Sequence, residues 1–189
     1  MENWIAFYAP FFPDRPTTET WVARCEALRH TKVMMHQAQR LITFADELPT
    51  IRRNVEPLQL MFLLMCAENV AKLHDKYVGE VCSRKYVHCF FERFVIGDDR
   101  RMMEQAFTDN NDHLLRPLSF KQVVNVLYDV RCDVVHEGNY QDFAFHDGAM
   151  PMVNVAPDIT ANISLADLRA VLVRGCINAV NDRLNTPIS

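Results

Sequence analysis

The sequence predicts an all-α protein, a bundle of about five main helices with a small β-hairpin inserted before the last one. Hydrophobic residues make up 49% of the chain and glycine occurs only five times, which favours a compact helical protein over a β fold rich in turns. Apolar residues also recur at the spacing of buried helix faces along most of the sequence. A chain of 189 residues is long enough to bury a substantial core as one domain.

Residues 1–19 are predicted to form an arm rich in aromatic residues and proline, ahead of a single helical domain over 20–189. The three prolines of the arm argue against a regular helix, whereas its aromatic side chains are expected to leave water. Two placements are open: a cover over the core of the same subunit, which we favour, or a strap across a partner subunit. The residues concerned are Trp4, Phe7, Tyr8, Phe11 and Phe12, with Pro10, Pro13 and Pro16.

Two long helices are predicted next, over 20–48 and 57–78. Both carry apolar residues at the i, i+4, i+7 spacing of a buried stripe. Pro49 and the arginines that follow it are expected to form the turn, and such a short connection should leave the two helices antiparallel. His74 falls on the apolar side of the second helix, so we expect it at the edge of the core rather than as a ligand.

The middle of the chain predicts two shorter helices and a loop. A helix over 83–95 should end at Gly97, and a short fourth helix follows it. Residues 108–118, which contain several Asp and Asn residues and Pro117, are expected to form a loop. Basic and acidic side chains are mixed throughout this region, which indicates a solvated surface rather than a basic patch.

The C-terminal third should contain two more helices with a hairpin between them. The first begins with a capping box, Ser119 and then Gln122, and should stop at Gly138. Short alternating runs over 143–146 and 152–155, on either side of Asp147-Gly148, predict the hairpin. Ser164 should then begin a last helix that runs to about residue 184.

The composition excludes several classes of function. A net charge of −4 and a pI near 6.0 argue against a protein that coats nucleic acid by bulk attraction, so any contact with RNA must be local. The longest apolar run, Leu60–Ala67, is far shorter than the roughly 20 residues that span a membrane. The N-terminus also lacks the basic start of a secretion signal. We therefore expect a cytoplasmic protein that does not bind membranes.

The six cysteines fall within apolar helical patterns and form no C-x-x-C pair. Reduced, buried thiols are therefore expected. Cys82, His88 and Cys89 are the nearest approach to a metal site, but no second pair of ligands lies at the spacing of zinc sites. Neither a metal nor another cofactor is expected. The cysteines are Cys25, Cys66, Cys82, Cys89, Cys132 and Cys176.

The most informative segment is Val130–Gly138, which reads V-R-C-D-V-V-H-E-G. It places Arg131 and His136 where a strongly apolar helix is about to end. Guanidinium binds phosphate through two parallel charge-assisted hydrogen bonds and keeps its charge. Imidazole gives or takes a proton near neutral pH. Together the two groups are sufficient for RNA cleavage without a metal.

The longer segment Val126–Gly138, V-L-Y-D-V-R-C-D-V-V-H-E-G, resembles the signature helix of the HEPN superfamily, whose motif is Arg, four to six residues, then His. Members are all-α domains, usually homodimers, and many are metal-independent ribonucleases of toxin, antiviral or RNA-processing systems. The resemblance implies that Arg131 binds phosphate and that His136 is catalytic. The chain departs from the motif at Cys132, where Asn, Asp or His is common.

Helix geometry places the two motif residues on different faces. Five residues turn an ideal helix through about 500°, so Arg131 and His136 should point roughly 140° apart. They act on one phosphate only if the helix ends at His136 or if two copies of the motif face each other across a dimer axis. The resemblance implies the second arrangement. Asp133 is expected to orient His136 or keep it protonated, with Cys132 as the other supporting residue.

Three functions follow from these observations. The first is a HEPN-like endoribonuclease of toxin or phage-defence type, in which the ribose 2′-hydroxyl attacks the adjacent phosphate at a site shared by two subunits. The second is a non-catalytic HEPN-like dimer that binds RNA, a nucleotide or a protein partner. The third is a helical interaction protein unrelated to HEPN, in which the aromatic arm drives association. In this third interpretation Arg131 forms surface ion pairs and His136 only faces the helix dipole.

Overall fold

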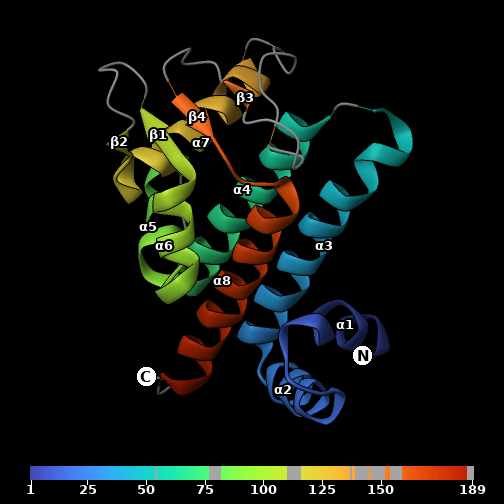
Figure 1. The fold of residues 1–189 in the computed structure, drawn as a ribbon. Helices are drawn as coiled ribbons and strands as arrows, with labels where there is room; N and C mark the ends of the chain where they lie inside the picture. The colour runs from blue at the N-terminus through green and yellow to red at the C-terminus, as the bar shows by residue number, and fades with distance from the viewer. Residues whose placement is uncertain are drawn as a thin grey trace.

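The computed structural model of the chain describes residues 1–53, 55–76, 82–109, 116–136, 138, 145, 152–153 and 159–186. These residues form eight α-helices, one 3₁₀ helix and a small sheet, and Figure 1 shows their arrangement. The predicted all-α class is confirmed. The expected number of about five main helices is too low for this part of the chain, because the N-terminal segment contains α1 and because the helix predicted over 20–48 is two helices.

The helices are α1 (Glu2–Tyr8), the 3₁₀ helix η1 (Ala9–Phe11), α2 (Arg15–Ala27), α3 (Arg29–Ile51), α4 (Glu56–His74), α5 (Ser83–Phe94), α6 (Gly97–Ala106), α7 (Phe120–His136) and α8 (Leu165–Asn185). The strands are β1 (Phe107–Asp109), β2 (Arg116–Pro117), β3 (Met152–Val153) and β4 (Ile159–Ala161).

The centre of the bundle is α4, which packs against α3, α5, α7 and α8. A helix enclosed by others needs apolar residues on all its sides, and α4 is apolar over most of its surface. As expected from their short connection, α3 and α4 lie antiparallel (Figure 1). The buried residues of α4 are Pro57, Leu60, Leu63, Leu64, Cys66, Ala67, Glu68, Val70, Ala71 and His74.

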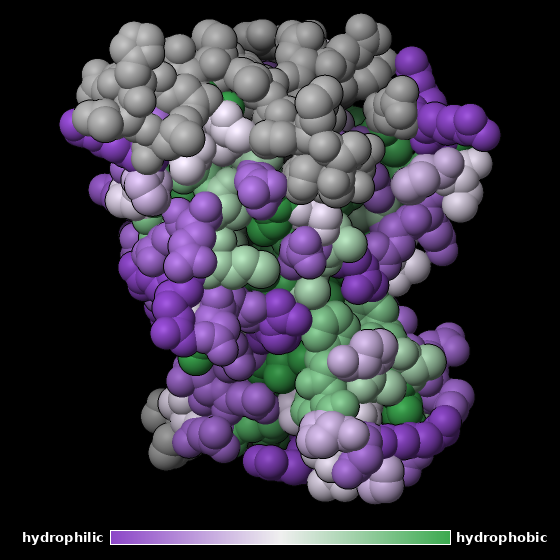
Figure 2. Space-filling view, in the orientation of Figure 1, coloured by the Kyte–Doolittle hydropathy of each residue, from purple (hydrophilic) through white to green (hydrophobic). Residues whose placement is uncertain are grey.

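The N-terminal segment contains a helix, contrary to the expectation from its prolines. Its helix α1 ends before Pro10, which lies in η1. Pro16 occupies the first turn of α2, where the backbone N–H has no partner within the helix, so proline removes no helical hydrogen bond. The segment packs on the chain's own core: Tyr8 is 1% exposed, and its hydroxyl donates to the carbonyl of Met35 over 2.9 Å. Figure 2 shows an apolar surface over α1.

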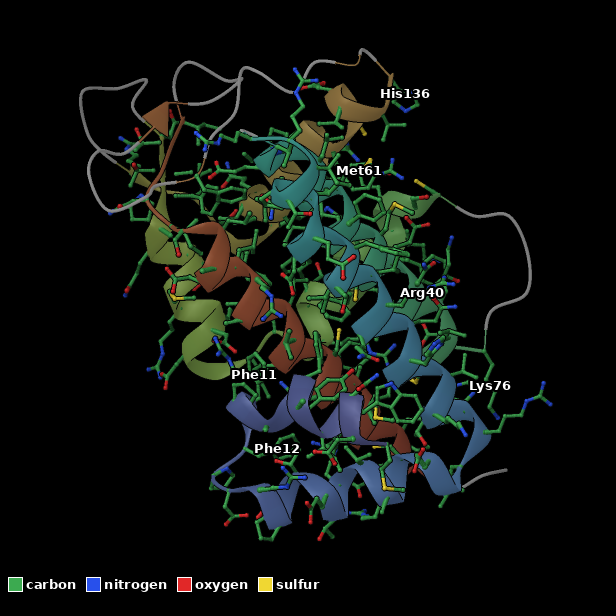
Figure 3. All side chains as sticks on the ribbon, turned by 90° about the vertical axis from the view of Figure 1, so that its right-hand side faces the viewer. Phe11, Phe12, Arg40, Met61, Lys76 and His136 are labelled. Carbon is green, nitrogen blue, oxygen red and sulfur yellow. The ribbon has the colours of Figure 1, made fainter. Side chains whose placement is uncertain are left out.

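The single helix predicted over 20–48 is two helices that meet at Leu28. This residue has an extended backbone, with φ −115° and ψ 121°, so α2 turns away from α3 (Figures 1 and 3). The hydroxyl of Thr31 donates to the carbonyls of Cys25, over 2.8 Å, and of Leu28, over 3.1 Å. The carbonyl of Cys25 thereby gains a donor in place of the helical one, and the turn is made without glycine or proline.

A hydrogen bond connects α2 to α8. The buried indole of Trp21, in α2, donates to the side-chain oxygen of Asn181, in α8, over 2.7 Å.

Pro49 was predicted to lie in the turn that follows the helix over 20–48, but it lies inside α3. Its position removes one backbone donor from the helix, and the side chain of Gln59, in α4, donates to the carbonyl of Ala45 over 2.9 Å instead.

A small antiparallel sheet, in the order β2-β1-β4-β3, lies in the region of the predicted hairpin. Part of the predicted run 152–155 forms β3, which pairs with β4. Of the other predicted run, 143–146, the structure describes only Phe145, so its pairing with β3 stays a prediction. Phe145 is buried outside any strand, and its N–H donates to a carboxylate oxygen of Glu56 over 2.7 Å. Asp147-Gly148, the predicted turn, lies outside the described residues.

The predicted loop over 108–118 also contributes to this sheet. Its first residues belong to β1, which lies between β2 and β4, and Arg116–Pro117 form β2. Each strand has two or three residues, too few for a period of two to be visible in the sequence. The strands join segments some 50 residues apart, Phe107–Asp109 and Ile159–Ala161, a pairing that no local pattern indicates.

The predicted helix starts are confirmed at both C-terminal helices. The side chain of Gln122 accepts from the N–H of Ser119 over 3.0 Å, which is one half of a capping box. Ser164 caps α8 by accepting from the N–H of Asp167 over 3.0 Å. Within the described ranges, no helix is both long and apolar enough to cross a bilayer.

All six cysteines are free, but the expectation that all are buried holds for only half of them. Cys25, Cys66 and Cys176 are buried, whereas Cys82 is exposed and Cys89 is half-buried. Cys132, in the motif, is half-buried as well. Cys89 and Cys132 lie within α5 and α7 at positions where periodicity does not separate buried from partly covered residues, whereas Cys82 precedes α5 as its N-cap.

Candidate functional site

The motif residues lie in the last two turns of α7. The core face of this helix holds Val123, Leu127 and Val130, all buried, which fixes its rotation against the bundle. His136 is the last residue of α7, and Gly138 has φ +64°, a conformation that favours glycine after a helix end. The motif therefore lies at the exposed end of a helix whose core face is packed against the bundle.

Arg131 points inward, towards α4. Its Nη2 atom lies 4.0 Å from Oε2 of Glu68, and its side chain is only 17% exposed. The guanidinium carbon lies 5.3 Å from the centre of the Tyr128 ring. Glu68 itself is 8% exposed and accepts from Nζ of Lys72 over 2.6 Å. Arg131 thus faces a buried carboxylate and an aromatic ring, both favourable neighbours for guanidinium.

His136 is exposed. Figure 3 shows it at the end of the molecule opposite Phe11 and Phe12. Within one chain, α7 therefore directs Arg131 to Glu68 and Tyr128 and leaves His136 on solvent. The divergence expected from helix geometry is what the structure shows, so one α7 does not bring both groups to one phosphate. Asp133 and Cys132 are half-buried between them on the same helix.

A second arginine reaches α7 from α5, and sequence reasoning missed it. Nη2 of Arg84 donates to Oδ1 of Asp129 over 2.5 Å, and its guanidinium carbon lies 4.7 Å from the centre of the Tyr128 ring. The guanidinium also interacts with the thiol of Cys132. The only sequence signal was that Asp129, Cys132 and His136 share one helix face. Nothing local indicated that a residue of α5 would lie on it.

These side chains form one polar group between α4, α5 and α7, which we call the Tyr128 cluster. The Tyr128 ring lies close to the guanidinium groups of Arg84 and Arg131. The cluster has three cationic side chains and two carboxylates, so its net charge is +1. Burial raises the pKa of Tyr128, so the phenol stays protonated at neutral pH. The cluster consists of Glu68, Lys72, Arg84, Tyr128, Asp129 and Arg131.

The charge on Arg84 is secure. Burial lowers the pKa of its guanidinium, but the carboxylate of Asp129 and the contact with Cys132 outweigh that effect and raise it. Side chains of Arg84 and Asp129 are 42% and 58% exposed, so their ion pair contributes little to stability. An exposed, permanently charged guanidinium beside the motif is suited to binding an anion.

The residues considered for a metal site do not gather into one. Nε2 of His88 lies 2.9 Å from the side-chain oxygen of Asn125, and Cys89 is near Arg93 and Asp75. Across the part of the chain that the structure describes, no three His, Cys, Asp or Glu side chains form a group that would hold a metal ion.

A second polar group lies where α4 and α8 end. His74 is 7% exposed, as expected for the core edge, with Nε2 2.7 Å from Asp182 and Nδ1 3.0 Å from Asp75. Nη1 of Arg93, in α5, donates to Asp75 over 2.7 Å. The group connects the ends of three helices, and its position at the core edge gives it a structural role.

Comparison with known proteins gives no match to a family model, to a curated protein or to a solved structure.

Proposed function

We propose that the chain is a HEPN-like, metal-independent endoribonuclease of toxin or phage-defence type. The observation that supports this best is the arrangement at the end of α7. There an exposed imidazole, His136, follows a guanidinium, Arg131, that a buried carboxylate holds in place. Such a pair supplies a proton-transfer group and a cation for phosphate, which is what cleavage of RNA by its own 2′-hydroxyl needs.

In the proposed reaction the ribose 2′-oxygen bonds to phosphorus while the bond from phosphorus to the 5′-oxygen breaks. His136 takes the proton of the 2′-hydroxyl as general base, and a second imidazole or water gives a proton to the departing 5′-oxygen. Arg131 stabilises the charge that grows on the phosphate oxygens. The products are a 2′,3′-cyclic phosphate and a 5′-hydroxyl.

The divergence of the two residues along α7 favours a site made by two subunits. In a two-fold dimer, residues of the same helix end approach each other from both chains. Arg131 of one subunit and His136 of its partner then act on one phosphate. RNA, a second copy of the chain and an inhibitory antitoxin are the partners that this proposal implies, in the cytoplasm.

The alternative is a non-catalytic HEPN-like dimer that binds RNA, a nucleotide or a protein. One observation favours it: Arg131 already faces Glu68 and is mostly covered, so less of the guanidinium is available to a substrate. Cys132, in place of the Asn, Asp or His common in the resembled motif, agrees with this alternative.

A cleavage assay in excess EDTA decides between the two. Fluorescent single-stranded RNA is incubated with the wild type, His136→Ala and His36→Ala, the last being an exposed histidine of α3 that serves as control. We expect the wild type and the control to cut alike, and His136→Ala to lose about 10²–10⁴-fold in rate. Equal cutting by the wild type and His136→Ala, or cutting only with magnesium, overturns the nuclease proposal. RNA binding without cleavage supports the alternative.

A further inference from the structure

Arg84 and His136 come from different helices, but Arg84 lies on the same face of α7 as His136. Its guanidinium bonds to Asp129 and interacts with Cys132. His136 follows Cys132 by four residues, one turn of helix, which is a rise of about 6 Å. Asp129, the residue that Arg84 bonds to, precedes His136 by seven residues, or about two turns on the same face. Arg84 and His136 therefore lie along one face of α7, where a bound RNA strand would reach both within a single chain.

Arg84 is also the more accessible of the two arginines near the motif. Its side chain is 42% exposed, against 17% for Arg131, whose guanidinium faces the buried Glu68. Guanidinium has five N–H donors, so the contacts of Arg84 with Asp129 and Cys132 leave others for an anion. Asp129 and the Tyr128 ring then act as supports that hold the planar group in one orientation.

We propose that Arg84 binds the scissile phosphate beside His136 of the same chain, as a second guanidinium in addition to Arg131. This assignment rests on the proposed ribonuclease function. It gives Cys132 a role: its side chain helps to raise the pKa of the Arg84 guanidinium, at a position where the resembled motif more often has Asn, Asp or His. Each site would then combine Arg84 and His136 of one subunit with Arg131 of its partner.

The first test compares Arg84→Gln with Arg93→Gln, a matched control on the same helix. Arg93 makes the same kinds of contact: with Asp75 over 2.7 Å, with the ring of Phe94 at 5.0 Å and with a cysteine, and its side chain is 41% exposed. A merely structural effect should therefore be similar in the two variants. We expect Arg84→Gln to lower kcat/KM about 10²-fold, as loss of one charge-stabilising donor does, and Arg93→Gln to change it by less than about twofold.

Binding under non-cleaving conditions provides a second readout. The ligand is an analogue of the RNA with 2′-deoxy sugars, which binds without reacting because it lacks the attacking 2′-hydroxyl. Its affinity is measured over a range of salt concentrations. Removal of one phosphate contact should lower the slope of log K against log salt by about one in Arg84→Gln. Arg84→Lys should keep that slope because it keeps the charge. It should still lose part of kcat/KM, because lysine cannot form the bidentate contact.

Mixing inactive variants separates contacts made within a chain from contacts made between chains. If Arg131 acts across the dimer, Arg131→Ala mixed with His136→Ala recovers about a quarter of wild-type activity. The reason is that half of the randomly formed dimers are mixed and each has one intact site. Arg84→Gln mixed with His136→Ala should recover nothing, because every His136 that remains lies in a chain without Arg84.

The outcomes distinguish a failure of the proposed role of Arg84 from a failure of the proposed ribonuclease function. Wild-type activity in Arg84→Gln, or recovery in its mixture with His136→Ala, overturns the role of Arg84 and leaves the nuclease proposal standing. Equal cutting by the wild type and His136→Ala overturns both. If neither mixture recovers, the site shared between subunits is wrong, and the comparison of Arg84→Gln with Arg93→Gln decides the role of Arg84.

Discussion

The side-chain amide of Gln59 donates a hydrogen bond of 2.9 Å to the backbone carbonyl of Ala45. In a regular helix this carbonyl accepts from the N–H four residues later, but the residue there is Pro49, which has none. The following helix therefore supplies the donor that α3 lacks. This bond explains how α3 continues through a proline to Ile51, where the sequence predicted a turn.

Gln59→Leu should destabilise the protein by about 1 kcal/mol, because the carbonyl of Ala45 loses its partner. In a Pro49→Ala background, alanine supplies a backbone donor to the same carbonyl, so the Gln59 substitution should cost less. Urea unfolding of the four proteins in this double-mutant cycle measures the difference. Equal costs in both backgrounds would show that the bond does not replace the one that proline removes.

Gly175→Ala should destabilise the bundle at the contact between α8 and α5. A Cβ atom at this position would lie 2.8 Å from Cζ of Phe90, whose ring is fully buried. Overpacking of this kind costs about 1–3 kcal/mol, more than the roughly 1 kcal/mol that alanine gains over glycine in helix propensity. Adding Phe90→Leu should make room and recover part of the loss in thermal unfolding. A Gly175→Ala protein more stable than the wild type would contradict this packing.

Acid should weaken the group around His74. Burial raises the pKa of Asp75, but hydrogen bonds from His74 and Arg93 outweigh it and hold that pKa below its ordinary value of 3.8. The unfolded chain then binds the proton more readily, so Asp75 stabilises the fold above pH 3.8 and loses this effect as the pH falls through its lowered pKa. Asp75→Asn should be less stable than the wild type at pH 7, and the difference should shrink at pH 3 in urea unfolding. Asp98→Asn, at an exposed position, is the control and should show no such trend.

Arg131 and His136 should act as a unit. Arg131→Ala and His136→Ala should each remove most of the cleavage, and the double variant should lose little more, as groups that serve one transition state do. The stabilities should differ, because His136 is exposed whereas Arg131 faces the buried Glu68. Thermal unfolding should show the larger decrease for Arg131→Ala. Fully additive losses in rate would show that the two residues do not share a site.

Cys132→Asn introduces the residue common in the resembled motif. The amide can accept a hydrogen bond from Arg84 in place of the thiol, so we expect cleavage to be kept or raised. Cys89→Asn, a half-buried cysteine beside Arg93, is the matched control and should leave cleavage unchanged. A complete loss of cleavage in Cys132→Asn alone would indicate that the thiol itself is needed.

Periodicity located the helices whose apolar stripes face a neighbour. The predicted helix over 83–95 is α5, Ser83–Phe94, and the capping residues marked the starts of α7 and α8. Periodicity did not reveal the break between α2 and α3 at Leu28, because the apolar stripes of the two helices continue one another and the turn needs no glycine or proline. The short strands escaped for a different reason: each has only two or three residues, and β1 pairs with β4 across some 50 residues of sequence.

The candidate site was predictable only along one helix. Arg131 and His136 were recognised by their spacing, and their divergence followed from the helical repeat. Arg84, Glu68 and Lys72 come from α4 and α5, and only packing brings them to Tyr128. The sequence of a helix shows which of its own residues share a face, because these are three or four positions apart. Contacts with residues of other helices depend on how the helices pack in the bundle.

The bond between Trp21 and Asn181 has a consequence for the order in which the chain folds. Residues of α3 and α4 follow one another closely and are able to pair soon after synthesis, since short loops close at little entropic cost. Trp21 has to wait for a partner 160 residues further on. Until α8 has been made, the indole lacks its hydrogen-bond partner and the part of its cover that α8 supplies, and we expect this face to be what a chaperone meets on the nascent chain. Ribosome-bound chains that stop before residue 165 should therefore expose Trp21 to a fluorescence quencher, and chains that include α8 should protect it.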